Sequence, residues 1–112
     1  MTADEFRRLA LSFPDVIEAS HMGHADFRVG GKIFATLGYP SDESAVVMLP
    51  TQDQDLMVRD NPTTFSPASG KWGASGSTNV VLRGASKRAI AIALEAAWRK
   101  RAPRRLVAKF DL

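Results

Sequence analysis

The chain has 112 residues, of which 45% are hydrophobic and 24% are charged, a balance typical of one ordinary globular domain over residues 1–112. The absence of cysteine excludes disulfides, a thiolate nucleophile and cysteine-ligated metal sites. No stretch is long and apolar enough for a membrane span or for the core of a signal peptide, so we expect a cytoplasmic protein with no membrane partner.

The charge is distributed unevenly along the chain. The formal net charge is +3, but residues 1–82 carry a net −4 and residues 83–112 carry a net +7. A basic segment attached to a mildly acidic body indicates either an anionic partner or a tail that folds back onto the body.

The first helix is predicted over residues 2–12. Thr2 and Glu5 have the spacing of a capping box, in which each side chain accepts a hydrogen bond from a free backbone N–H. Apolar residues then recur at helical spacing, and Pro14 ends the pattern.

Residues Asp26–Leu37 predict a β-hairpin. Two β-prone runs flank Gly30 and Gly31, and a type I′ turn requires positive φ at both central residues, which glycine adopts without strain. A two-residue turn pairs Phe27 with Phe34 on one face of the sheet. The second run is apolar on both faces, which predicts a central strand rather than an edge strand.

The other elements are read from the same kinds of pattern. The stretch at 63–78 is rich in glycine and serine, and we expect an irregular loop that Phe65 and Trp72 anchor to the core. One or two further helical turns are expected after Pro103. The remaining elements are a strand at 16–20 followed by a turn or irregular link at 21–24, a strand at 45–49, a helix capped by Thr51 that runs to about 59 with Leu56 and Met57 facing inward, a strand at 79–83, and a helix capped by Ser86 that runs to about 101.

The predicted element order is α-β-β-β-β-α-β-α. Hairpin-linked strands flanked by helices are typical of an α+β domain, with an antiparallel β-sheet and helices packed on one face. The sequence contains no internal repeat, low-complexity segment or linker that would divide residues 1–112.

Three blocks that cover most of the chain are FPDVIEASHMGHADFRVGGKIFATL at 13–37, FSPASGKWGASGSTNVVL at 65–82 and EAAWRKRAPRRLVAKFD at 95–111. In order and spacing they resemble the MmcQ/YjbR-like family of small bacterial proteins. The resemblance implies a frataxin-like (CyaY-like) fold and a DNA-binding protein with a double-wing arrangement. One departure is Ser77, which stands where we expect an aromatic residue before the threonine of the last strand. It implies that a grip on a partner is weaker there or is made elsewhere.

The basic C-terminal segment is the main candidate for binding DNA, because guanidinium and ammonium groups neutralise phosphates and release counterions. The hairpin tip is a second candidate, because a narrow Gly-Gly turn between two cations can approach a backbone closely, as a wing would. The alternatives are a tail whose cations favour the helix dipole and pair with body carboxylates, and an ordinary tight turn. The residues predicted to contact nucleic acid are Arg28, Lys32, Lys87, Arg88, Arg99, Lys100, Arg101, Arg104 and Arg105.

Other residues that could carry chemistry form weaker patterns. His21, His24 and Asp26 offer metal-ligating atoms, but two histidines in an expected turn, with no cysteine, predict neither a metal site nor a cofactor. Trp72 is either a plug on the core or an exposed platform on which bases stack. The serines lack a nucleophile-elbow context and the chain has no phosphate-binding loop motif, so we expect no catalytic residues and no enzyme activity.

The sequence therefore predicts a DNA-binding protein that is directed to phosphates and is weakly sequence-specific. The alternative is a protein-interaction or small-ligand-binding module that uses a cleft near Phe65, Trp72 and the hairpin and has no role with nucleic acid.

Overall fold

The computed structural model describes all residues from 1 to 112. The predicted α+β class with an antiparallel sheet is confirmed, but the predicted order omits three elements. Two of them lie in the stretch expected to be an irregular loop, and the third is the expected helix after Pro103. The elements are α1 (Ala3–Leu11), β1 (Ile17–His21), β2 (His24–Val29), β3 (Lys32–Leu37), β4 (Ser44–Met48), α2 (Thr51–Asp60), β5 (Phe65–Pro67), α3 (Gly70–Ala74), β6 (Ser77–Val81), α4 (Lys87–Arg101) and α5 (Arg104–Phe110).

All six strands form one sheet in the order β1-β2-β3-β4-β6-β5, and every neighbouring pair is antiparallel. Because side chains alternate between faces along a strand, the register assigns each residue to one face. On the face that the core covers, one row of paired residues is Ala25, Leu37, Ala45, Val80 and Phe65. On the opposite face, called the open face below, one row is Ala19, Asp26, Thr36, Val46, Asn79 and Ser66.

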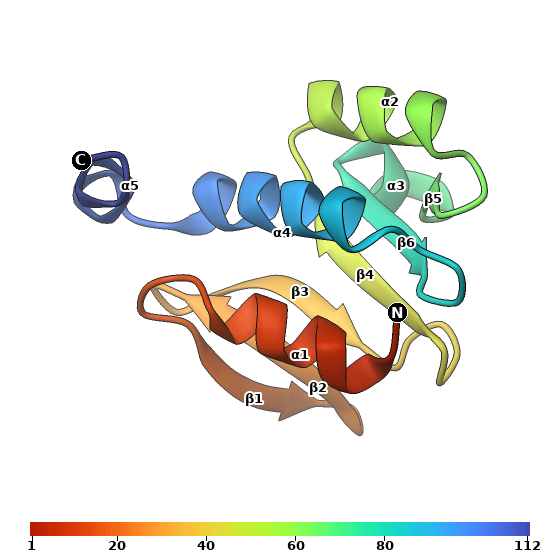
Figure 1. The fold of residues 1–112 in the computed structure, drawn as a ribbon, viewed down its shortest axis with the longest axis horizontal. Helices are drawn as coiled ribbons and strands as arrows, with labels where there is room; N and C mark the ends of the chain where they lie inside the picture. The colour runs from red at the N-terminus through yellow and green to blue at the C-terminus, as the bar shows by residue number, and fades with distance from the viewer.

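Helices α1 and α4 lie across the core face of the sheet (Figure 1). Helix α1 buries Phe6, and α4 buries an apolar stripe that ends at Trp98. The indole of Trp98 is fully buried, and its Nε1 donates a hydrogen bond to the carbonyl oxygen of Pro14 at 3.1 Å. The predicted packing of helices on one face therefore holds for α1 and α4, whereas α3 borders the open face.

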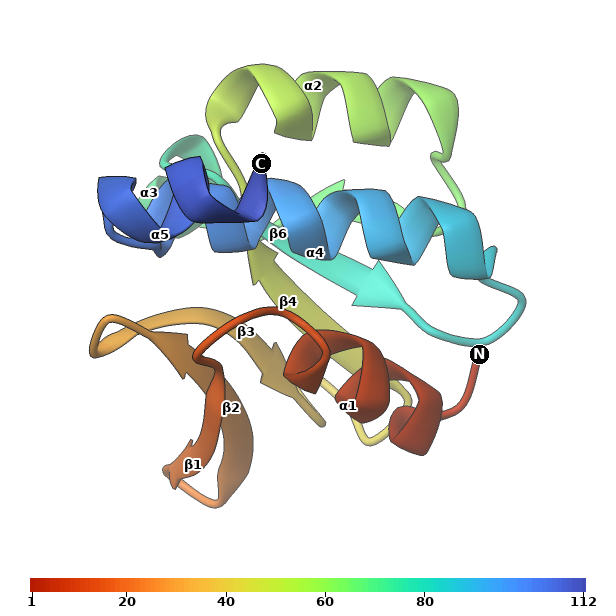
Figure 2. The same ribbon diagram turned by 60° about the vertical axis from the view of Figure 1, so that its left-hand side comes forward.

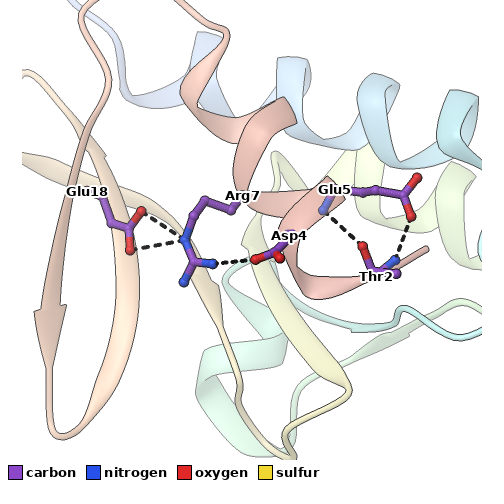
Figure 3. Close-up of polar contacts among 5 residues, drawn as sticks. All are labelled: Thr2, Asp4, Glu5, Arg7 and Glu18. Atoms are coloured by element: carbon purple, nitrogen blue, oxygen red, sulfur yellow. Dashed lines mark hydrogen bonds and ion pairs between the residues drawn. The ribbon is translucent and has the colours of Figure 1, made fainter.

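The capping box predicted at the start of α1 is confirmed (Figure 3). The N–H of Glu5 donates to Oγ1 of Thr2 at 3.1 Å, and the N–H of Thr2 donates to Oε1 of Glu5 at 3.0 Å. The hydrogen bond from the Thr2 backbone lowers the pKa of the Glu5 carboxyl. On the same helix, Arg7 donates to Asp4 and to Glu18 at 3.0 Å each, which ties α1 to β1 (Figure 3).

The predicted hairpin is formed by β2 and β3, and Gly30 and Gly31 both have positive φ, at 59° and 78°. Its register follows the prediction only near the turn. A β-bulge then places Phe27 opposite Ala35, so the predicted Phe27–Phe34 pair is wrong. The bulge leaves Phe34 without a cross-strand partner, and Phe27 packs edge-on against Phe6 of α1 at a centroid distance of 6.2 Å.

Helix α2 differs from its prediction at both its start and its buried side. Thr51 is the first helical residue and Pro50 is the N-cap, with no side-chain cap. Leu56 is 46% exposed, so its predicted inward orientation is wrong. The side chain that α2 buries is Gln54, whose amide Nε2 donates to atoms of α3 and β6 rather than to water.

The two expected anchors of the 63–78 stretch have opposite environments. Phe65 is buried in the core as predicted, but Trp72 is 76% exposed and does not anchor the stretch to the core. The stretch itself is regular, since it contains β5, α3 and the first residues of β6.

Helix α5 is docked on the end of α4. Phe110 packs on Trp98 with ring centroids 4.9 Å apart, and Arg99 donates to both carboxylate oxygens of Asp111 at 3.0 and 2.6 Å. The guanidinium of Arg99 also lies 5.3 Å from the Phe110 ring. None of the helices is both long and apolar enough to cross a membrane.

Candidate functional site

The open face of the sheet carries a groove made of two adjoining cavities, of about 390 and 480 Å³. Volumes of this size are typical of small-molecule and short-segment sites. The two cavities share five lining residues, so they form one continuous surface, which we call the open-face groove. The shared residues are His21, Thr36, Met48, Trp72 and Ser77.

One half of the groove is basic. Arg28, Lys32, Lys100 and Arg101 line the larger cavity, and no carboxylate side chain lines it. These cations come from two parts of the chain that sequence analysis treated separately, the hairpin and the C-terminal segment. We call these four residues the basic half of the groove.

The hairpin tip meets the C-terminal segment at Gly30. A β-carbon placed on Gly30 would lie 3.1 Å from Cδ of Pro103 and 3.9 Å from the carbonyl oxygen of Arg101. The backbone of the turn therefore packs against the link between α4 and α5. Figures 1 and 2 show the tip of the β2–β3 hairpin next to this link.

The other half of the groove is aromatic and apolar. Trp72, Tyr39 and Met22 border the smaller cavity and are 76%, 51% and 92% exposed. The Tyr39 ring contacts the His24 ring edge-on at a centroid distance of 5.3 Å. Large apolar side chains that gather around one cavity while exposed are typical of a binding surface.

Backbone packing and one buried amide hold α3, and with it Trp72, at the rim of the groove. A β-carbon on Gly73 would lie 1.7 Å from the carbonyl oxygen of Ala68, so only glycine fits at this approach. The amide of Gln54 donates to the Gly73 carbonyl oxygen at 2.9 Å and to Oγ1 of Thr78 at 3.1 Å. Trp72 thus projects from a segment that is fixed on both sides.

A fully buried carboxylate, Asp26, lies beneath the basic half. Arg28 donates from Nε to Oδ1 at 2.7 Å and from Nη2 to Oδ2 at 3.0 Å, and Nδ1 of His21 lies 2.7 Å from Oδ2. These hydrogen bonds, that from Arg28 above all, lower the pKa of Asp26 although burial opposes the shift. The pair with Asp26 raises the pKa of Arg28. Asp26 therefore fixes the Arg28 guanidinium and offsets one positive charge of the groove.

The two cations that α4 contributes are partly enclosed. Nζ of Lys100 donates to the carbonyl oxygens of Leu49 and Ser75, at 3.0 and 3.3 Å. Burial, together with the neighbouring charge of Arg101, lowers the pKa of Lys100. Nε of Arg101 is buried and has no hydrogen-bond partner. Lys100 thus has a structural role as well as a charge, whereas Arg101 forms no ion pair.

The sequence that carries this groove matches a known protein family. The model of the YjbR family matches residues 11–100. The chain belongs to the YjbR family.

A solved structure similar to this YjbR-family protein is that of protein DR2400 from Deinococcus radiodurans, which is described as a DUF419 domain. It is 15% identical, with a TM-score of 0.76, and the match covers 99% of this chain and 88% of that chain. At this identity the likeness shows the fold alone, and the frataxin-like comparison stays a prediction. No curated protein matches the chain.

In this YjbR-family protein, the predicted nucleic-acid-binding residues fall into four places. Arg28, Lys32, Lys100 and Arg101 line the groove, and Arg104 and Arg105 are exposed on α5 directly after Pro103. Arg99 is committed to Asp111 and Glu95, which raise its pKa, and these partners belong to the basic segment itself rather than to the body. Lys87 and Arg88 begin α4, about 20 Å from its other end given a rise of about 1.5 Å per residue.

Sequence reasoning missed the buried network at Asp26, which it considered only as a metal ligand. No group of three or more His, Cys, Asp or Glu side chains is placed to hold a metal ion. A signal for the network was present, since Asp26 and Arg28 are two residues apart on a strand and therefore share a face. The contribution of His21 depends on the β1–β2 register, in which His21 pairs with His24.

Proposed function

We propose that this YjbR-family protein is a binding protein for DNA, which it contacts through phosphates at the basic end of the molecule. The observation that carries the proposal is the meeting of the hairpin tip and the C-terminal segment at Gly30 and Pro103. It concentrates cations from both parts of the chain on one surface. The surface comprises the basic half of the groove together with Arg104 and Arg105 of α5.

Three of the six cations of this surface are free to meet an anion. Lys32, Arg104 and Arg105 are exposed and form no ion pair, in contrast to Arg99. Arg28 is paired with Asp26, which holds its guanidinium in one orientation at the groove. A pre-oriented guanidinium loses less conformational entropy when it binds a phosphate oxygen.

Contacts of this type predict weak sequence specificity. Lysine and arginine side chains that bind phosphates position a protein on nucleic acid but carry no information about base sequence. The hairpin tip is the wing that this proposal uses. Gly30 packs against Pro103, whereas a β-carbon on Gly31 would have no neighbour within 4 Å, so that side of the turn leaves Lys32 open to a phosphate backbone.

The test is fluorescence anisotropy of a short labelled duplex across a salt series from ~50 to ~200 mM. Log Kobs should fall linearly with log salt concentration for the native protein. In the variant Lys32→Ala/Arg104→Ala/Arg105→Ala, the slope should become shallower by up to ~2.7, because each phosphate that is no longer neutralised reduces it by ~0.9.

The matched control is Arg8→Ala/Arg59→Ala/Arg83→Ala, which removes the same charge from exposed positions outside this surface. An equal change of slope in both variants would show a response to net charge alone. The absence of binding to any DNA at the lowest salt concentration would refute the proposed function.

A second candidate is a small-ligand-binding module, and the cavity of about 390 Å³ in the aromatic half of the groove favours it. A ligand of that kind would bind without dependence on the exposed cations of α5. Binding of a small anion that Arg104→Ala/Arg105→Ala leaves unchanged, with no binding of DNA, would support this candidate over the first.

A further inference from the structure

The groove carries an exposed indole beside its cations. Contacts with the phosphates of a duplex leave this indole unoccupied. Trp72 lines both cavities, so the same side chain borders the aromatic half and the basic half. An occupant that satisfies both halves needs a flat apolar group and an anionic group joined over a short distance. A nucleotide has this composition, with a base and a phosphate.

We infer that the open-face groove binds a single DNA strand, with an unpaired base stacked on Trp72 and its phosphates at the basic half. This inference rests on the proposed function and names its substrate class. In a duplex the faces of the bases are covered by their stacked neighbours. A single strand exposes those faces, and base–aromatic stacking is sequence-tolerant because every base has a π-face.

Trp72 combines a fixed backbone with an exposed side chain, as a platform for base stacking requires. Its helix is fixed by the close approach of Gly73 to Ala68 and by the amide of Gln54, while the indole itself is 76% exposed. The backbone is thus already ordered, and binding costs little beyond fixing the indole rotamer. An open sheet face flanked by aromatic residues is also how several RNA-binding modules receive unpaired bases.

The remaining lining of the aromatic half is consistent with a base. Tyr39, His24 and Met48 offer ring and thioether contacts, and Ser69 and Asn79 offer hydrogen-bonding groups at the cavity wall. Ser77 lies where the two cavities join, and its small side chain leaves the passage between them open. Charge complementarity then orients the strand, because the cations line only one of the two cavities.

The experiment compares a labelled single strand, a duplex of the same length and an abasic single strand by anisotropy. The native protein should bind the single strand more tightly than either of the others. Trp72→Ala should weaken binding of the single strand ~5- to ~160-fold, the range expected when a stacking aromatic is replaced by alanine, and should leave duplex binding unchanged. Trp72→Phe should restore most of the loss.

A second readout reports on the residue itself. The chain has two tryptophans, and Trp98 is fully buried, so quenching of the exposed emission by added single strand monitors Trp72. Trp72→Phe should abolish this quenching while the emission of Trp98 reports that the fold is intact. Ile92→Ala, which removes an exposed apolar side chain on the outer side of α4, is the matched control and should change neither signal.

The possible failures are distinguishable. If duplex and single strand bind equally and Trp72→Ala changes neither, the inference is overturned and the proposed function stands. If no DNA binds at the lowest salt concentration, both are overturned. Quenching of Trp72 by acidic peptides but by no DNA would assign the groove to a protein partner and overturn the inference, while the anisotropy of the duplex would still decide the proposed function.

Discussion

Trp98 and Trp72 lie on opposite sides of the same sheet, and the two residues differ in the number and kind of contacts that hold them in place. Trp98 is enclosed by Phe13, Phe110 and the apolar stripe of α4, so many contacts fix its position. Trp72 is positioned by a few backbone and polar contacts around Gly73 and Gln54. Residues on the core face are therefore held by many overlapping contacts. The position of Trp72 on the open face depends on a few interactions, any of which one substitution can remove.

The largest expected effect is the loss of stability on replacing Trp98, in contrast to Trp72. Trp98→Ala should lower the free energy of unfolding by ~3–5 kcal/mol, because it empties a fully buried volume and leaves the Pro14 carbonyl oxygen without its donor. Trp72→Ala should change it by no more than ~0.5 kcal/mol, as expected at an exposed position. Urea denaturation measures both, and similar losses in the two variants would contradict the contrast between the faces.

The second prediction concerns the close contact of Gly73 with Ala68, which holds α3 at the rim of the groove. Gly73→Ala should cost ~2–3 kcal/mol, because its β-carbon would overlap the Ala68 carbonyl oxygen and force α3 to move. The displacement should also alter the emission of Trp72 and weaken binding of a single strand. Ala74→Ser, at the exposed neighbouring position, is the control. A variant with native stability and native Trp72 emission would show that the approach of Gly73 to Ala68 is not tight.

The smallest of the three effects depends on pH. Asp26→Asn should cost ~1–2 kcal/mol at neutral pH, because it removes the charge that pairs with Arg28 and His21. The folded-state pKa of Asp26 lies below its unfolded value, so its contribution is complete above the ordinary aspartate pKa of ~3.9 and declines as pH falls below it.

Urea denaturation of Asp26→Asn and native protein from neutral pH to below pH ~4 checks the sign. The two unfolding free energies should converge at the acid end. A difference that is constant with pH, or that grows toward acid, would show that Asp26 does not gain its stability as a carboxylate.

Local patterns predicted the local structure well. The capping box of Thr2 and Glu5 and the turn at Gly30 and Gly31 depend on residues within a few positions of each other, and both formed as expected. The bulge at Phe34 was not predictable, because it arises where the strand must fit its neighbours and α1 at once. Of the two residues of α2 predicted to face inward, Met57 packs against the core but Leu56 does not. The burial of Gln54 was missed, because it depends on acceptors in α3 and β6, which are distant in the sequence.

The residues of the site could be predicted from the sequence, but the way they come together could not. The cations of the hairpin and of the C-terminal segment were identified from composition, but their meeting at Gly30 and Pro103 is a tertiary contact with no local signal. The environment of Trp72 was left open between core and surface, because a tryptophan among glycines fits both. The only sequence signal that Asp26 and Arg28 form a pair, unlike the solvated charges, is that residues two positions apart on a strand lie on the same face.

The contact of Gly30 with Pro103 also has a consequence for the order in which the basic half assembles. The hairpin turn closes through neighbouring residues, whereas Lys100 and Arg101 belong to α4, far along the chain from the turn. Arg28 and Lys32 therefore meet the cations of α4 only once the turn and the link between α4 and α5 are in contact. A change that displaced this link would separate the two pairs of cations without removing a single charge.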